Sequence, residues 1–149
     1  MTNKKTLPPT YFIVTIILQV LIHFVFPFLW LLIFPVNLIG VIFIAAGAAL
    51  NIFADKAMKE ANTTVKPFEE SSHLLTEGAF KISRNPMYFG MFLVLIGVAT
   101  ILGSIIPFIL AFIFVRIINR RFIVIEEEML LDKFGKEWQF YKNEVRRWI

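Results

Sequence analysis

Four long apolar runs, separated by segments that hold almost all of the charge, constrain this chain more than any other feature of its sequence. The runs cover residues 11–34, 36–54, 87–102 and 105–118. A helix of about 20 apolar residues crosses the hydrocarbon core of a bilayer. The first two runs have that length, and the last two, joined by Gly103-Ser104, are typical of a tight helical hairpin. The sequence therefore predicts an all-α integral membrane protein with about four transmembrane helices.

Composition agrees with lipid as the solvent and excludes several kinds of site. Hydrophobic residues make up 58% of the 149 positions, whereas a soluble domain has about 45–50%. The chain has no Cys and two His, which excludes thiolate chemistry and argues against a bound metal. We expect a single domain, with two membrane helices in residues 1–54 and a long polar loop, a helical hairpin and C-terminal helices in residues 55–149.

The basic residues predict the orientation of the chain in the membrane. All 15 Lys and Arg lie in residues 4–5, 56–84 and 116–147. With four spans these segments share one side, and the positive-inside rule makes that side the cytoplasm, at the inner membrane of the cell. The net charge of +4 favours contact with anionic membrane lipids over nucleic acid. The first run is about twice as long as the core of a signal peptide, so we interpret it as a retained helix.

Smaller features predict how the helices pack. Two pairs of glycines spaced seven residues apart share a helix face and favour close helix contact: Gly40 with Gly47, and Gly90 with Gly97. Gln19 and His23 share a face of the first helix, which favours hydrogen bonds between helices rather than a functional site. Residues 134–148 predict an interfacial helix that follows a turn at Gly135, with its Trp and Tyr side chains among the headgroups.

Polar residues gather at both ends of the predicted hairpin. Arg84-Asn85-Pro86 either only starts the third helix, because Asn is a favoured N-cap and Pro a favoured first residue, or belongs to a site. Beyond the fourth run, residues 126–128 are three adjacent glutamates. Under α-helical periodicity Glu127 shares a face with Arg116 and Arg120. These carboxylates therefore either pair with arginine or face a bound cation.

The same residues follow the pattern of a known enzyme family. The chain reads Leu74-Leu75-Thr76-Glu77-Gly78-Ala79-Phe80, then Arg84-Asn85-Pro86-Met87-Tyr88-Phe89-Gly90, then Glu126-Glu127 and Phe134-Gly135-Lys136-Glu137-Trp138-Gln139-Phe140-Tyr141. In order and spacing, residues 62–148 resemble the isoprenylcysteine carboxyl methyltransferase and phospholipid methyltransferase superfamily. Asn85 stands where the family usually has His, and Phe80 where it usually has Tyr.

The resemblance implies methyl transfer from S-adenosylmethionine to a lipid or lipid-linked carboxylate or amine. Carried over by position, it implies these cofactor-binding residues: His73, Leu74, Leu75, Phe80, Arg84, Asn85, Pro86, Met87, Tyr88 and Glu126. The catalytic candidates are Glu126 facing the sulfonium, Glu127 as a base for an amine, and Arg121 holding an acceptor carboxylate or phosphate. No metal ligand is implied.

Two other functions fit part of the sequence. A membrane reductase related to the sterol reductases would share the cofactor region, although the chain lacks a Gly-rich dinucleotide fingerprint. A non-catalytic membrane scaffold would use the polar residues as helix caps and ion pairs alone. The identity of the acceptor and the oligomeric state are open at this point.

The predicted topology has a direct test. A cysteine placed at Ser71 or at Lys142 should resist a membrane-impermeant thiol reagent that is applied outside intact cells, because both positions are expected in the cytoplasm. The native chain contributes no background, since it has no Cys. Labelling of either position from outside would contradict the four-span arrangement.

Overall fold

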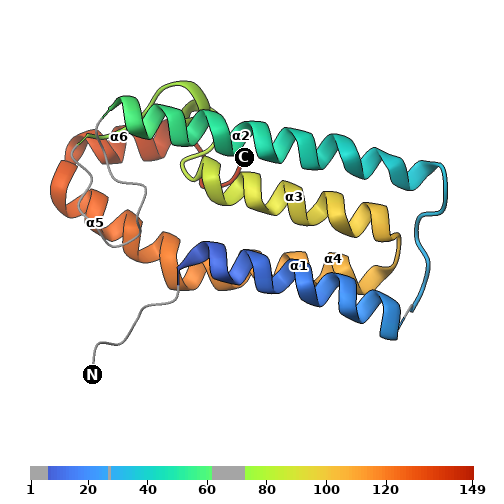
Figure 1. The fold of residues 1–149 in the computed structure, drawn as a ribbon. Helices are drawn as coiled ribbons and strands as arrows, with labels where there is room; N and C mark the ends of the chain where they lie inside the picture. The colour runs from blue at the N-terminus through green and yellow to red at the C-terminus, as the bar shows by residue number, and fades with distance from the viewer. Residues whose placement is uncertain (1–6, 27, 62–72) are drawn as a thin grey trace.

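The computed structural model describes residues 7–26, 28–61 and 73–149, and within them the chain is helical apart from loops and one isolated bridge between Trp30 and Ser104. Figure 1 shows the arrangement. The elements in chain order are α1 (Pro8–Val25), the 3₁₀ turn η1 (Val36–Ile39), α2 (Gly40–Glu60), the 3₁₀ turn η2 (Gly78–Lys81), α3 (Pro86–Leu102), α4 (Ile105–Ile118), the π-helical turn η3 (Asn119–Ile123), α5 (Val124–Phe134) and α6 (Lys136–Glu144). Positions 71 and 72 and the rest of residues 62–72 lie outside the described ranges.

The four long helices run side by side, with α3 packed against both α2 and α4. Helix α1 packs against α4 and α3. The start of α1, the end of α2, the start of α3 and the end of α4 lie at the same end of the bundle (Figure 1). Helices α5 and α6 also lie at this end (Figure 1), together with the charged residues at the end of α2 and before α3.

The predicted hairpin between the third and fourth helices is confirmed. Helix α3 begins at Pro86, where proline loses no helical hydrogen bond. It ends at Leu102 and is followed by Gly103, which has a φ of 76°, a backbone conformation that glycine adopts without steric cost. Pro107 lies in the first turn of α4, where it is also tolerated.

The first helix is shorter than its apolar run. Helix α1 ends at Val25, and Phe26 has a non-helical backbone, as expected for a residue that precedes a proline. From Phe28 on, the apolar residues form a loop that hydrogen bonds to the α3–α4 hairpin. The N–H groups of Leu31 and Leu32 donate to the carbonyl of Gly103 at 2.7 and 3.1 Å. The prediction of one helix through residue 34 is therefore wrong.

The second helix is longer than its apolar run. Helix α2 continues through the charged residues that follow Ala54 and ends at Glu60. Pairs of opposite charge four residues apart support this extension. Lys59 Nζ lies 2.6 Å from Asp55, and Lys56 Nζ lies 3.7 Å from Glu60. The loop to α3 therefore begins six residues later than the sequence indicated.

Two segments have the length and composition to cross a membrane, Pro8–Val25 and Val36–Glu60. Helices α3 and α4 are shorter, at 17 and 14 residues. Large apolar side chains such as Phe24, Phe53 and Phe112 are more than half exposed on the outer faces, as suits a surface in contact with lipid. The all-helical class is confirmed, and the four-span arrangement stays a prediction.

Close packing of α2 on α3 occurs at the paired glycines. A Cβ built on Gly47 would lie 2.5 Å from the carbonyl oxygen of Gly90, and one built on Gly90 would lie 2.7 Å from that of Gly47. Gly40 and Gly97 face each other in the same way. The helix backbones are thus in direct contact, as the glycine spacing predicted.

The Gln19 and His23 side chains join helices, as predicted. The buried Gln19 amide donates to the carbonyls of Leu95 at 3.1 Å and Pro107 at 2.8 Å. His23 Nδ1 lies 2.8 Å from the hydroxyl of Ser104, at the hairpin. These bonds link α1 to α3 and α4 inside the bundle.

Gly47→Ala should destabilise the bundle, because its added methyl group meets a backbone carbonyl that a rotamer change cannot move aside. We expect a loss of about 1–3 kcal/mol in the free energy of unfolding, measured by thermal or denaturant unfolding in detergent. Ala46→Val is the control, since Ala46 is exposed on the same helix. Equal stability of the two variants would contradict the close α2–α3 contact.

Candidate functional site

The polar end of the bundle is built where α3 begins, where α4 passes into α5, and where the chain ends. Between α4 and α5, η3 is a π-helical turn, which holds more residues than an α-helical turn. Side chains beyond it are therefore rotated away from the directions that continuous α-helical periodicity predicts. This rotation places Glu126 and Glu127 against partners from other segments.

Glu127 is buried in an ion-pair cluster with two arginines. Its Oε1 lies 3.2 Å from Nη2 of Arg84, and both side chains are more than 90% buried. Arg147 donates from Nε to Oε1 at 3.0 Å and from Nη2 to Oε2. Of the two alternatives that the sequence left open, pairing with arginine holds for Glu127. The arginines are Arg84 and Arg147, and not Arg116 and Arg120, with which continuous α-helical periodicity would align Glu127, because η3 alters the helical register.

Arg84 is held tightly but is incompletely satisfied. Its guanidinium lies 5.5 Å from the ring centroid of Trp138. Among the described residues, its Nε and Nη1 have no hydrogen-bond partner although both atoms are buried. Burial lowers the pKa of Arg84, an effect that Glu127 opposes. Two buried donors without acceptors can receive an anionic group from a ligand.

Glu126 has different surroundings from its neighbour Glu127. The hydroxyl of Tyr88, on α3, donates to Glu126 Oε1 at 2.6 Å. Burial raises the pKa of the Glu126 carboxyl; the Tyr88 hydrogen bond lowers it, and the adjacent Glu127 adds to the rise. The described partner of Glu126 is thus a hydroxyl group, whereas Glu127 is neutralised by guanidinium groups.

Asn85 precedes the first residue of α3, but its side chain does not cap the helix. Its Nδ2 donates to the backbone carbonyl of Arg147 at 3.1 Å. The hydroxyl of Ser83 donates to the same carbonyl at 3.1 Å and accepts from the N–H of Asn85 at 3.1 Å. The N-cap position is confirmed, and the side chain binds the end of the chain instead of the helix.

Aromatic side chains extend from Glu126 towards α1. The ring of Tyr88 lies 6.5 Å from that of Phe122, which lies 5.7 Å from that of Tyr11. Arg121 donates from Nη1 to the Tyr11 hydroxyl at 3.0 Å. Arg121 is exposed, and its contact with Tyr11 of α1 places it at the α1 end of this row.

The remaining predicted residues lie on the loop before α3 and on its first turn. His73 is exposed, and Leu74 and Leu75 are half-buried. Phe80, in η2, is half-buried, and its carbonyl accepts a hydrogen bond from the Tyr141 hydroxyl at 2.7 Å. Pro86 is buried and Met87 half-buried.

Among the described residues, direct side-chain contacts join two pairs of the predicted site residues. These pairs are Arg84 with Glu127, and Tyr88 with Glu126. In the part of the chain that the structure describes, no group of three or more His, Cys, Asp or Glu side chains could hold a metal ion.

Sequence reasoning missed several residues of this region. Trp138 and Tyr141 were expected among lipid headgroups, but they are 2% and 5% exposed and pack under Arg84 and η2. Ser83, Asn119 and Arg147 carried no local signal of a role. Arg147 donates from Nη1 to Asn119 Oδ1 at 3.1 Å. The aromatic residues at the end of the family pattern were the one sequence feature that pointed to this segment.

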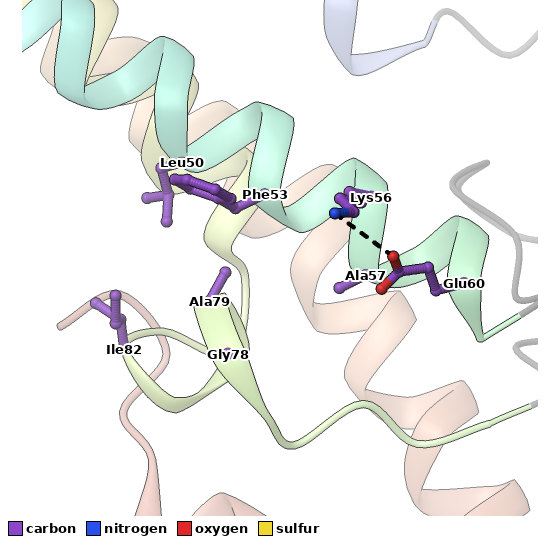
Figure 2. A pocket seen from close by; sticks show the side chains of 8 residues that line it. All are labelled: Leu50, Phe53, Lys56, Ala57, Glu60, Gly78, Ala79 and Ile82. Carbon is purple, nitrogen blue, oxygen red and sulfur yellow. Dashed lines mark ion pairs between the residues drawn. The ribbon is translucent and has the colours of Figure 1, made fainter.

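A shallow pocket of about 390 Å³ lies between α2 and η2 (Figure 2). Its walls are mostly apolar, and the Lys56–Glu60 ion pair lies along one side. The lining residues are Leu50, Phe53, Lys56, Ala57, Glu60, Gly78, Ala79 and Ile82. None of the predicted site residues lines this pocket, although Ala79 directly precedes Phe80.

Comparison with known proteins adds family information. A family model described as phospholipid methyltransferase matches residues 36–137, more than half of the chain. An uncharacterized protein of Haemophilus influenzae is 38% identical over 63 residues, which are 42% of this chain and the whole of that protein. No solved structure matches.

Neutralising each of the two adjacent carboxylates, Glu126 and Glu127, should change the stability of the fold in opposite directions. Glu127→Gln leaves Arg84 buried without its counter-ion and should cost about 3–5 kcal/mol of stability. Glu126→Gln should raise the melting temperature at neutral pH, because it removes an ionised carboxylate that burial disfavours.

The pH dependence follows from the direction of the Glu126 pKa shift. A carboxyl whose folded-state pKa is raised destabilises the fold above that pKa, and the cost vanishes as pH falls below the ordinary Glu range. The gain of Glu126→Gln over the wild type should therefore shrink with acidification. Glu128→Gln, at an exposed neighbour, should change stability by less than about 0.5 kcal/mol. Equal effects of the Glu126 and Glu127 variants would contradict the site geometry.

Proposed function

The chain belongs to the phospholipid methyltransferase family, and from this membership we propose that it transfers a methyl group from S-adenosylmethionine to a lipid or lipid-linked acceptor at the cytoplasmic face of the membrane. The family implies methyl transfer and lipid substrates, and together with the two apolar helices it indicates a membrane protein. The identity of the donor, the position of each site residue and the side of the membrane are parts of the proposal.

The observation that carries the proposal is the contrast between Glu126 and Glu127. The two arginines compensate Glu127, whereas Glu126 is a half-buried carboxylate whose described partner is the Tyr88 hydroxyl. A carboxylate in this setting attracts a cation, and the aromatic ring of Tyr88 beside it, which neighbours that of Phe122, favours the same charge. S-adenosylmethionine carries its reactive methyl group on a positively charged sulfur, so its charge fits this position.

The unsatisfied donors of Arg84 match the other charge of the cofactor. S-adenosylmethionine also has a carboxylate, and Arg84 offers buried Nε and Nη1 donors without acceptors. Glu126 and Arg84 thus provide complementary charges at the start of α3. The apolar residues Leu74, Leu75, Phe80, Pro86 and Met87 would hold the nucleoside, with His73 and Asn85 as polar contacts.

Positioning accounts for most of the catalysis in this proposal. Methyl transfer is an in-line displacement that needs the donor methyl group and the nucleophile about 3–3.5 Å apart. A carboxylate acceptor needs no base, whereas an amine must lose a proton. Both oxygens of Glu127 are engaged by arginines, which favours a positioning role for Glu127. Glu126, whose pKa is raised, is the better proton acceptor. Arg121, exposed beside α1, would hold an acceptor carboxylate or phosphate.

The topological part of the proposal follows the charge. The ends of the helices that carry the basic segments lie together (Figure 1), as a shared cytoplasmic side requires. In this arrangement four helices span the inner membrane, both termini are cytoplasmic, and the acceptor reaches the site from the bilayer.

Calorimetry with the purified protein in detergent tests the proposal. We expect binding of S-adenosylmethionine and of its demethylated product, and none of NADPH. Glu126→Gln should weaken binding of the cationic donor by about 1–3 kcal/mol, the range for a charge-assisted contact. The neutral-sulfur product should be affected far less, because it lacks the charge that Glu126 opposes.

Glu128→Gln serves as the matched control, since it removes a charge from an exposed neighbour. Equal weakening of both ligands by Glu126→Gln would remove Glu126 from the sulfonium site. NADPH binding without any signal from S-adenosylmethionine would instead favour a reductase, and binding of neither would favour a scaffold. A labelled-methyl assay with total membrane lipid would then identify the acceptor.

A further inference from the structure

The last five residues, 145–149, form a strap that returns to the start of α3. Val145 is extended, with φ −116° and ψ 131°. The carbonyl of Arg146 accepts the N–H of Arg84 at 3.0 Å. The carbonyl of Arg147 accepts the Ser83 hydroxyl and the Asn85 amide, both at 3.1 Å. The strap thus binds three consecutive residues before α3 through its backbone.

The side chain of Arg147 binds the opposite half of the site. Its Nε and Nη2 hold the two oxygens of Glu127 on α5, and its Nη1 donates to Asn119 in η3. A guanidinium group can form such a fork because its donors lie in one rigid plane, which a lysine ammonium cannot reproduce. One residue therefore joins the start of α3, the π-helical turn and α5.

We propose that Arg147 is a positioning residue of the methyl-donor site, acting through Asn85 and Glu127; this inference rests on the proposed function. The residues proposed to bind the donor fall into two groups that are far apart in the sequence. One group, within residues 73–88, contains Asn85 and the start of α3, and the other contains Glu126, directly before Glu127. Arg147 sets the distance between the two groups because it bonds to Asn85 in the first group and to Glu127, the neighbour of Glu126, in the second.

A positioning role has a different signature from direct charge stabilisation. Arg147 touches the anionic partner Glu127 rather than Glu126, so its loss disturbs the shape of the site without changing the charge that faces the sulfonium. Binding of the cationic donor and of the neutral-sulfur product should therefore weaken together. The Glu126→Gln variant, in contrast, should act mainly on the cationic donor.

The test compares Arg147→Ala and Arg147→Lys with the wild type by calorimetry against S-adenosylmethionine and its demethylated product. Each variant should bind both ligands at least about tenfold more weakly, because the hydrogen bonds that fix Glu127 and its neighbour Glu126 are lost. The KM for the methyl donor should rise while the KM for the acceptor lipid stays within about twofold. Arg146→Ala is the matched control, because Arg146 is exposed and its contact with Arg84 uses the backbone carbonyl, which the variant retains.

The outcomes separate this inference from the function on which it rests. A wild-type protein that binds neither ligand would overturn both. If the wild type binds both ligands and a folded Arg147→Lys protein binds each of them as tightly as the wild type does, the positioning role is wrong and the proposed function stands. If Arg147→Ala does not fold, Arg147→Lys decides alone, since it keeps the positive charge near Glu127. Weakening confined to the cationic donor would also overturn a positioning role.

Discussion

The polar end of this protein depends on one buried carboxylate, Glu127, and the two guanidinium groups that neutralise it. Arg84 comes from the residue pair before α3, and Arg147 from the end of the chain. A buried charge that loses its partner is costly, so these segments must come together for the fold to be stable. Because Glu126 is adjacent to Glu127 on α5, the ion-pair cluster also fixes the position of the Glu126 carboxylate, whose described partner is the Tyr88 hydroxyl. Structural and functional roles thus fall on neighbouring residues.

The helical bundle supplies a rigid support for that cluster. Contact between the backbones of α2 and α3 at Gly47 and Gly90 leaves no room for a side chain. On the opposite side of α3, the Gln19 amide binds carbonyls of both α3 and α4. Such contacts hold helices together where hydrophobic burial gives little preference, because lipid is as apolar as the helix faces. Helix α3, whose first turn carries Tyr88, is therefore held in place relative to α1, α2 and α4.

Local signals in the sequence predicted the parts of the fold that local chemistry decides. Pro86 and Gly103 mark the two ends of α3, and the glycine spacing predicted the α2–α3 contact. The errors have physical causes as well. Pro27 limits the conformation of Phe26, so the apolar run continues beyond the end of α1 at Val25. Oppositely charged residues four apart extend α2 past its apolar run to Glu60. Of the site, the family pattern identified Arg84, Tyr88, Glu126 and Glu127, which the structure joins in pairs.

The sequence by itself determined the helical class, the apolar lengths, the clustering of charge in three segments and the residue types available for chemistry. These properties depend on composition and on neighbours within one helical turn. Only the tertiary structure decided which carboxylate is compensated and which is not. The π-helical turn η3 rotates α5 relative to α4, and Arg147 reaches Glu127 from 20 residues further along the chain. Helical periodicity carries no information across such a turn or between separate segments, so the different surroundings of Glu126 and Glu127 arise only when the chain is folded.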